Sequence, residues 1–347
     1  MNILVTGGAG FVGKALVAAL EARGERVRVL DLAPTGRVGD VVGSVVDRDV
    51  VRMAVEGIDC VFHLAGIAHL WTKDVRAFDR VNHMGTRIVL SAARAAGVKR
   101  FVQCSSLTTL VAARAPIGPS FASEALHLDP DDLVGPYPAS KRRADLAVLD
   151  AARAGFDALV AMPTEPLGPG DEGPTPPTGM ILDFLNGKTP ASIDCLLNFV
   201  PVDSLAAGLI AALDRGRRGE RYLLGGENVP MQRLLASLEK ASGRKMPTLR
   251  LPYSVALAAG VVDTALSGLT GKPPKAPLTG VRLAGRQVSF SSDKARRDLG
   301  WKARPFEPAL AETVRWLMET GRLVDPAAKK TDAAPPSAAV EAAPPSA

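Results

Sequence analysis

The 347-residue sequence predicts an α/β fold, in which a doubly wound parallel sheet of the Rossmann type is interleaved with a smaller C-terminal substrate-binding part. Short apolar runs alternate with helical stretches through the first half of the chain, separated by short turns. The first of these runs leads directly into a glycine-rich turn and a helix. Beyond residue 165 the alternation becomes irregular and prolines accumulate, which indicates a second, less regular part.

The first strand, turn and helix occupy residues 1–23, in the order that a dinucleotide-binding site requires. An apolar run at 1–5 precedes the sequence TGGAGFVG, and a helical stretch follows. Gly7 would permit the tight turn, Gly10 would let a pyrophosphate approach the backbone, and Gly13 would let the helix pack closely on the strand. The helix N-terminus would then face the phosphates. The expected dinucleotide contacts here are Gly7, Gly10, Phe11, Val12 and Gly13.

The second strand, residues 25–31, alternates polar and apolar residues and ends at Asp31. Asp31 lies 18 positions after Gly13 (31 − 13), near the spacing at which a carboxylate meets the adenosine ribose hydroxyls. Because a carboxylate there repels a 2′-phosphate, the sequence favours NAD, while the nearby Arg37 leaves NADP open. The alternative is that Asp31 only caps a turn.

The alternation continues with a strand, a helix, a strand, a helix and a strand at residues 41–46, 47–56, 59–66, 79–97 and 100–106. The middle strand of this series ends at Leu64, Ala65 and Gly66, where the backbone could lie against a nicotinamide ribose. Strand and helix in strict alternation predict a parallel sheet covered by helices on both faces.

The elements expected in the second half of the sequence indicate how the chain divides into domains. Residues 163–179 form a Pro- and Gly-rich loop that we expect to cross a pocket. A strand at 199–203 and a helix at 204–215 return to the sheet, and further helices are expected at 231–242, 253–269 and 308–320. The dinucleotide-binding domain is therefore assigned to 1–165 with 195–215, the substrate-binding part to 166–194 and 216–324, and a disordered tail to 325–347.

The apolar helix predicted at Tyr253–Leu269 has two interpretations. Only ten residues precede Asp263 without a charge, so the segment is too short to span a bilayer. It either covers the substrate pocket or lies on a membrane surface as a peripheral contact.

The composition of the chain argues against nucleic-acid binding, disulfide bonds and a metal site. A net charge of +6 without long Lys/Arg runs does not predict nucleic-acid binding. Cys60, Cys104 and Cys195 are scattered, which indicates reduced thiols and neither disulfides nor a metal site, and the four histidines lack zinc-type spacing. No signal peptide is recognisable, so we expect a cytoplasmic protein that could associate with a membrane.

A proton-transfer pair is predicted where a helix begins. Tyr137 and Lys141 are four residues apart, so their side chains share one helix face, and a nearby ammonium would lower the pKa of the phenol. Such a pair can exchange a proton with a substrate hydroxyl or ketone. Ser106 ends the strand 100–106 and would lie beside the nicotinamide, or else only cap a helix.

Together these segments resemble the extended short-chain dehydrogenase/reductase superfamily, also called the NAD-dependent epimerase/dehydratase family. The resemblance runs from residue 1 to about 320 and is carried by TGGAGFVG, His63–Gly66, Val81-Asn82 with Gly85-Thr86, Ser105-Ser106 and YPASK at 137–141. It implies that Ser106 binds the substrate oxygen, that Tyr137 is the general acid/base, and that Lys141 binds ribose and modulates the tyrosine. It also implies a supporting role for Asn82, a cofactor contact at Pro163 and a homodimer.

Within the superfamily the second half resembles the hopanoid-associated sugar epimerase subgroup, whose relatives include dihydroflavonol reductases and 3β-hydroxysteroid dehydrogenases; bacterial ceramide reductases are a further candidate. Sugar-nucleotide members usually carry an Arg and an Asn where this chain has Met162 and Glu165, and Gly43-Ser44 replaces their Gly-Asp. These departures favour an NAD(P)-dependent oxidoreductase acting on an apolar, lipid-type ketone or alcohol. A nucleotide-sugar epimerase with tightly bound NAD and a nonenzymatic dinucleotide-binding regulator are the alternatives.

Overall fold

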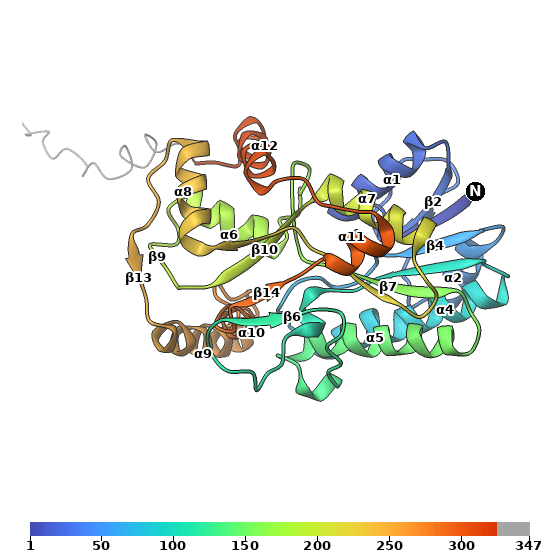
Figure 1. Ribbon diagram of the computed structural model, residues 1–347, viewed down its shortest axis with the longest axis horizontal. Helices are drawn as coiled ribbons and strands as arrows, with labels where there is room; N and C mark the ends of the chain where they lie inside the picture. Colours follow the sequence, from blue (N-terminus) through green and yellow to red (C-terminus); the bar gives the residue numbers. More distant parts are fainter. Residues whose placement is uncertain (325–347) are drawn as a thin grey trace, which may run out of the picture.

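The computed structural model describes residues 1–324, and the tail predicted at 325–347 lies outside the described residues. A 7-stranded sheet forms the centre of the molecule, in the order β11-β7-β5-β4-β1-β2-β3 (Figure 1). Every neighbouring pair in it is parallel. Its strands are β1 (Asn2–Thr6), β2 (Arg26–Asp31), β3 (Val41–Val42), β4 (Cys60–His63), β5 (Arg100–Cys104), β7 (Ala158–Pro163) and β11 (Arg221–Leu224). The predicted doubly wound sheet is confirmed.

Helices cover both faces of this sheet, because its strands carry apolar side chains on both faces. Alternate residues of β1 point to opposite faces, so Ile3 and Val5 join one apolar core and Leu4 joins the other. The first core packs against α1 (Phe11–Ala22), α7 (Val202–Arg215) and α11 (Asp293–Leu299). The second packs against α2 (Arg48–Val55), α4 (Gly85–Ala95) and α5 (Pro136–Arg153).

The helix predicted at 79–97 contains a π-helical segment. The chain runs through α3 (Arg76–Phe78), the π-helix η1 (Asp79–Met84) and then α4. A π-turn inserts an extra residue into a helix and turns its neighbours out of the regular register. The segment contains Asn82, which is buried.

A smaller three-stranded sheet forms the second part, in the order β12-β10-β8. Its strands are β8 (Glu165–Leu167), β10 (Leu196–Pro201) and β12 (Glu227–Pro230), and α6 (Pro176–Leu185), α8 (Met231–Ser242) and α12 (Phe306–Glu319) surround them. These elements share a third apolar core built on Leu167, Phe199, Leu234 and Leu310. Two further pairs of short strands complete the fold. β6 (Ser120–Ala122) pairs with β14 (Val288–Phe290) and links the two parts, whereas β9 (Ala191–Ser192) pairs with β13 (Leu249–Arg250) within the second part.

The boundaries predicted from the sequence need correction in two places. The strand predicted at 199–203 pairs with β8 and β12 in the small sheet, although α7 after it does return to the large sheet and packs on α1. Conversely, β11 lies within the range assigned to substrate binding but is an edge strand of the large sheet. Short apolar strands look alike in sequence, and only their hydrogen-bonding partners distinguish the two sheets. The strand predicted at 41–46 is also shorter than expected, at Val41–Val42.

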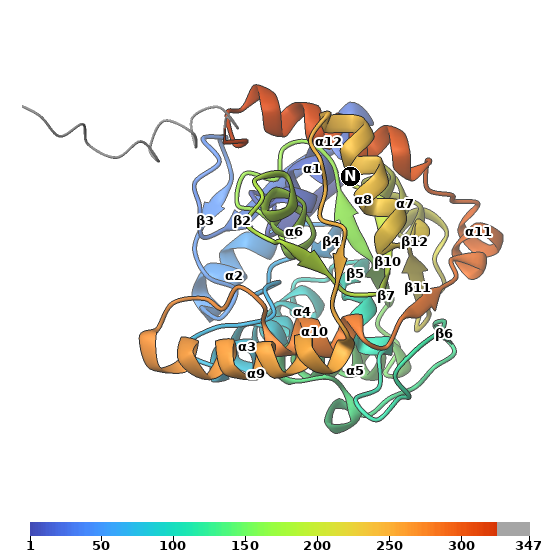
Figure 2. The ribbon, with the colours of Figure 1, turned by 90° about the vertical axis from the view of Figure 1, so that its left-hand side faces the viewer.

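Two helices close one side of the molecule. In Figure 2, α9 (Tyr253–Thr270) runs along the lower edge with α10 (Leu278–Ala284) between it and the body of the protein. Of the 18 residues of α9, only Gly260 and Ser267 are buried. By length and composition it is the one helix within residues 1–324 that could cross a membrane.

Candidate active site

The glycine turn leaves no room for a side chain at Gly7 or at Gly13. Gly7 has a φ of +75°, and a Cβ there would lie 2.7 Å from the Ala65 nitrogen. At Gly13 a Cβ would lie 2.1 Å from the Gly7 carbonyl oxygen, so the helix can approach the turn only because this side chain is missing. Leu64 and Ala65 therefore lie directly against the turn, and their predicted contact with the nicotinamide ribose stays a prediction.

The start of α1 fits an anion. Its first turn contains no acidic residue, and its N-cap residue Gly10 provides no side-chain cap. Gly10 is exposed, and Phe11 and Val12 behind it are half-buried. Unsatisfied first-turn amides at an accessible helix N-terminus bind phosphate groups. The turn and the helix start therefore fit the pyrophosphate of a dinucleotide.

Asp31 lies next to this turn. Its Oδ2 accepts a hydrogen bond from the Ala9 amide at 3.0 Å, and its Oδ1 accepts one from the Ala33 amide at 3.1 Å. The carboxylate therefore caps its own turn and also stands at the edge of the glycine turn. Arg37 is directed elsewhere, since its guanidinium contacts Glu21 at 2.5 Å and the Val27 carbonyl at 3.1 Å. Negative charge without a free cation beside it suits NAD better than NADP.

Ser106, Tyr137 and Lys141 come together where β5 ends and α5 begins. The Ser106 hydroxyl lies beside the Tyr137 phenol and acts to lower its pKa. Ser106 is also the N-cap of the 3₁₀-helix η2 (Leu107–Leu110), where its Oγ accepts from the Thr108 amide at 3.2 Å. The Lys141 ammonium donates to the Cys104 carbonyl at 2.6 Å. All three side chains are buried at the carboxyl edge of the large sheet.

The titration of Tyr137 differs from the expectation. Burial raises its pKa to about 12, and the Ser106 hydroxyl opposes this only in part. The sequence predicted a lowered pKa because of Lys141, but the ammonium is directed at the Cys104 carbonyl, and burial lowers its own pKa. The phenol is therefore a protonated donor at neutral pH.

Asn82 joins the loop after β4 to the start of α5. Its Oδ1 accepts from the Ile67 amide at 2.7 Å, and its Nδ2 donates to the Ile67 carbonyl and the Ser140 hydroxyl, both at 3.1 Å. A Cβ on Gly66 would lie 2.8 Å from Asn82 Oδ1 and 4.0 Å from Lys141 Nζ. The π-helix thus brings Asn82 to the side of Gly66 and Lys141, two of the residues that the sequence assigned to the site.

Sequence reasoning missed a chain of hydrogen bonds through His63. The Thr6 hydroxyl contacts His63 Nδ1 at 2.7 Å, and His63 Nε2 contacts Thr86 Oγ1 at 3.0 Å. Because Thr86 donates its one proton to the Asn82 carbonyl at 2.6 Å, Nε2 must be the donor and Nδ1 the acceptor. Burial and Lys141 lower the pKa of His63 to about 3, so the ring stays neutral and fixes the polarity of this chain.

Asp145 was also missed, although the spacing could have indicated it. It follows Lys141 by one helical turn and is fully buried, and its Oδ2 accepts from the Ser105 hydroxyl at 2.6 Å. Burial raises its pKa to about 6. Asp145 therefore anchors α5 to the end of β5, where Ser106 follows.

The remaining predicted residue, Pro163, ends β7 beside this group and pairs in register with Leu224. Glu165 follows it at the start of β8, and burial raises the pKa of its carboxyl to about 8. Its Oε2 has no hydrogen-bond partner among residues 1–324. Within residues 1–324 as a whole, no group of residues could hold a metal ion, and the three cysteines are free and buried.

Comparison with known proteins agrees with this geometry. The NAD dependent epimerase/dehydratase family matches residues 3–225. A putative dihydroflavonol 4-reductase of Synechocystis is 35% identical, over 91% of this chain and 94% of that protein. Sterol demethylase protein B of Methylococcus capsulatus is 31% identical, over 93% of this chain and 100% of that protein.

Two more similarities extend over nearly the whole chain. A 4-hydroxy-2-methyl-3-oxo-4-farnesyl-3,4-dihydroquinoline-1-oxide ketoreductase of Stigmatella aurantiaca is 31% identical, over 88% of this chain and 92% of that protein. Among solved structures, gox2253 superposes with a TM-score of 0.79 at 34% identity, over 93% of this chain and 99% of that one.

Proposed function

The chain belongs to the NAD dependent epimerase/dehydratase family, and from this premise we propose that it interconverts a ketone and a secondary alcohol on an apolar, lipid-type substrate. Membership makes it an NAD-dependent enzyme of the extended short-chain dehydrogenase/reductase type. The observation that carries the proposed reaction is the grouping of the buried Ser106, Tyr137 and Lys141 side chains at the carboxyl edge of the large sheet, with Lys141 one helical turn after Tyr137.

These side chains suit proton transfer at a substrate oxygen. NAD, when bound, supplies the two-electron hydride chemistry that the chain lacks. In the reducing direction the Tyr137 phenol donates its proton to the carbonyl oxygen, and Ser106 donates a hydrogen bond to the same oxygen. Lys141, whose ammonium donates to the Cys104 carbonyl, would hold the nicotinamide ribose, as the superfamily resemblance implies. Asn82 positions the loop at Gly66 through its contacts with Ile67 and Ser140.

Two residues near the end of β7 support an uncharged, apolar substrate. Met162 is fully buried, and Glu165 is an uncharged acid at neutral pH because its pKa lies at about 8. Sugar-nucleotide members of the superfamily usually carry an Arg and an Asn there. A diphosphate substrate would find no arginine at position 162 to bind it. It would also lie near the Glu165 carboxyl, which becomes negatively charged as the pH rises toward 8. The relatives named as a sterol demethylase protein and a farnesylated-quinoline ketoreductase are consistent with this substrate class.

The reaction is tested by following NAD(P)H absorbance with keto-sphingolipid, keto-steroid and UDP-sugar panels. We expect net NADH consumption with a lipid ketone. Tyr137→Phe should lose turnover by more than about 100-fold while NAD binding is kept, because only the transferable proton is removed. Tyr222→Phe, in the apolar core on the other face of the sheet, is the matched control and should keep full activity. Interconversion of UDP-sugars without net cofactor change would show that the enzyme is an epimerase instead.

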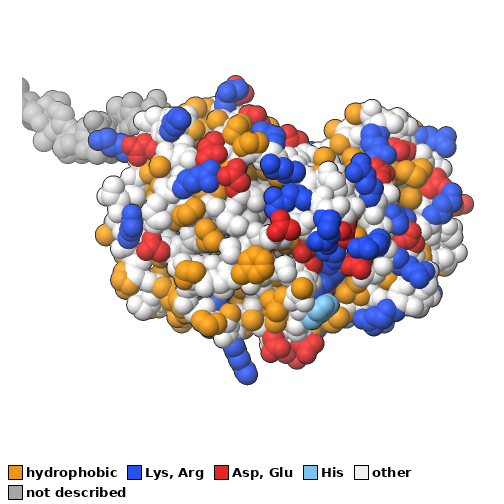
Figure 3. Space-filling model, in the orientation of Figure 1, with side chains coloured by type: hydrophobic (Ala, Val, Ile, Leu, Met, Phe, Trp, Pro, Cys, Tyr) orange, Lys and Arg blue, Asp and Glu red, His pale blue; other side chains and the backbone are white. Residues whose placement is uncertain are grey.

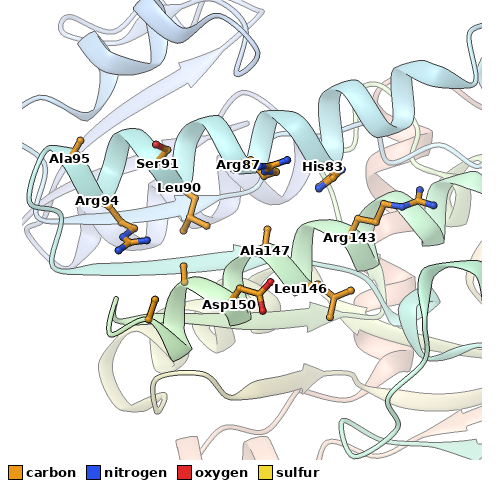
Figure 4. A pocket seen from close by; sticks show the side chains of 12 residues that line it. His83, Arg87, Leu90, Ser91, Arg94, Ala95, Arg143, Leu146, Ala147 and Asp150 are labelled. Atoms are coloured by element: carbon orange, nitrogen blue, oxygen red, sulfur yellow. The ribbon is translucent and has the colours of Figure 1, made fainter.

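We also propose that the enzyme is a homodimer, as the superfamily resemblance implies. A groove of about 990 Å³ lies between α4 and α5. In Figure 4, Leu90 and Ala147 lie between the two helices, Leu146 lines the groove from the outer side of α5, and Arg87, Arg94, Arg143 and Asp150 contribute charges of both signs. Apolar side chains rimmed by both signs of charge suit a two-fold contact with the same face of a second copy. Leu146→Glu should give a monomer in analytical ultracentrifugation, and a monomeric wild type would contradict the proposal.

A further inference from the structure

Helix α9 presents an apolar face that the rest of the described chain leaves uncovered. Its large side chains include Val255, Val261, Val262, Leu266 and Leu269, which are 49%, 47%, 59%, 52% and 84% exposed. Val255, Val262, Leu266 and Leu269 recur at intervals of seven, four and three residues, so these four lie along one side of the helix, and Val261 adjoins that side. In Figure 3 hydrophobic side chains gather at the lower left, where Figure 1 places α9 and α10.

The one charged side chain of α9, that of Asp263, points toward the chain before α10 and not along the exposed apolar face. Asp263 Oδ2 accepts a hydrogen bond from the Ala276 amide at 2.7 Å, and Thr264 Oγ1 accepts one from the Leu278 amide at 3.0 Å. These two bonds tie the inner side of α9 to the chain leading into α10. Since Asp263 is the only ionised group within the helix, the outer face carries no charge. The same bonds hold α9 lengthwise against the protein, so it lies on the surface and does not project as a spanning helix.

Cations flank this face at both ends. The segment from Arg244 to Ser292 contains seven arginines and lysines and one acid, Asp263, a net charge of +6 that equals that of the whole chain. Arg250 is exposed before the helix, and Lys272 and Lys275 are exposed after it. Lys73 approaches the same end, since its Nζ would lie 3.6 Å from a Cβ on Gly271.

We propose that α9 is the docking surface of this protein for an anionic lipid bilayer. An uncharged helical face with cations at its ends matches the hydrocarbon boundary and the phosphate layer of such a membrane. A second copy of the chain would supply no negative surface for these cations from the same, net positive segment. The charge complementarity therefore identifies an anionic membrane as the occupant.

The docking face also lies one helix away from Tyr137. A Cβ on Gly260 of α9 would lie 3.2 Å from the Val281 side chain of α10. On the other side of α10, Thr279 Oγ1 would lie 2.9 Å from a Cβ on Gly135, the N-cap of the helix that carries Tyr137. A membrane bound at α9 would therefore adjoin the wall of the site that meets an apolar substrate.

The test is vesicle sedimentation with the full chain and no substrate, so the result is independent of the proposed reaction. Vesicles contain phosphatidylcholine alone or with phosphatidylglycerol at about 30 mol%. We expect binding to the anionic vesicles, weakened by salt. Val262→Glu with Leu266→Glu should weaken partitioning by more than about tenfold, because two apolar contacts are replaced by repelled anions. The matched control is Met53→Glu, which alters a 57% exposed apolar residue on α2 and should leave binding unchanged.

A second variant tests the cationic ends without touching the helix. Lys272→Glu with Lys275→Glu should weaken binding to anionic vesicles by about tenfold and reduce its salt dependence. Equal sedimentation of wild type and both double variants would overturn the proposal. So would a change of oligomeric state in the Val262→Glu, Leu266→Glu protein without any effect on vesicle binding, because the face would then belong to a second copy. Circular dichroism and thermal unfolding verify that each variant is folded.

Discussion

The buried carboxyl of Glu165 makes the stability of this protein depend on pH in a calculable way. Its pKa is 4.5 in an ordinary environment and about 8 in the folded protein, where burial disfavours the charged form and the Asn198 amide opposes this only in part. In the interval between these values the folded state holds a proton that the unfolded chain has released. Stability is therefore greatest below the unfolded pKa and falls as the pH rises toward 8.

The magnitude follows from linkage. Each pH unit inside this interval costs about 1.4 kcal/mol, and integrating from about pH 6 to about pH 9 gives a loss of about 3 kcal/mol from this group. Glu165→Gln keeps the shape and a carbonyl acceptor for Asn198 but cannot ionise. The variant should therefore gain about 3 kcal/mol relative to wild type over the same range.

The assay is urea unfolding of wild type and Glu165→Gln at both pH values, followed by circular dichroism. Glu172→Gln is the matched control, because this exposed carboxylate pairs with Lys14 and its pKa is lowered, so it stays ionised across the range. If the stabilities of wild type and Glu165→Gln run parallel within about 0.5 kcal/mol, the carboxyl is not held neutral. The argument from Glu165 against a diphosphate substrate would then fail as well.

Three further substitutions test the cofactor site and its support. Gly13→Ala places a Cβ 2.1 Å from the Gly7 carbonyl oxygen, so it should weaken NAD binding by more than about 100-fold in a fluorescence titration. Gly268→Ala is the control and should leave NAD binding unchanged, because a Cβ there meets nothing within 4 Å. Asp31→Asn removes the charge that repels a 2′-phosphate, so the ratio of NADP to NAD turnover should rise by at least about tenfold; an unchanged ratio would place Asp31 outside cofactor selection. Asn82→Ala breaks three buried hydrogen bonds and should cost about 1–3 kcal/mol of stability together with kcat, and a loss of stability alone would remove it from the site.

Most of the large sheet could be read from the sequence because strand and helix alternate there at short intervals. Helix 231–242 was predicted with its observed bounds, and the strands carrying Asp31 and Ser106 were placed within two residues of their observed ends. Strand identity could not be assigned for β10 and β11. Each is a short apolar run, and the choice between two sheets depends on hydrogen bonds to residues far along the chain.

The candidate site shows the same division. Gly7, Gly13, Tyr137 and Lys141 were recognisable because their spacing is set by a local turn and by one helical turn. His63 and its hydroxyl partners were not recognisable as a network, since Thr6 and Thr86 lie in different elements and meet His63 only in the fold. Local geometry repeats in sequence, whereas contacts between elements leave no fixed spacing.

The fold class, the glycine turn, the acid that ends β2 and the Tyr–Lys pair could all be recognised before the fold was known, because each depends on residues close together in the chain. The charge states of buried groups and the exposed surfaces depend on contacts between distant segments, so they became apparent only in the folded protein. Burial set the pKa values of Tyr137, Asp145 and Glu165, and burial is a property of neighbours brought in from elsewhere. Likewise, the apolar pattern of α9 left two interpretations open, and the inward Asp263 with the exposed opposite face favoured the membrane surface.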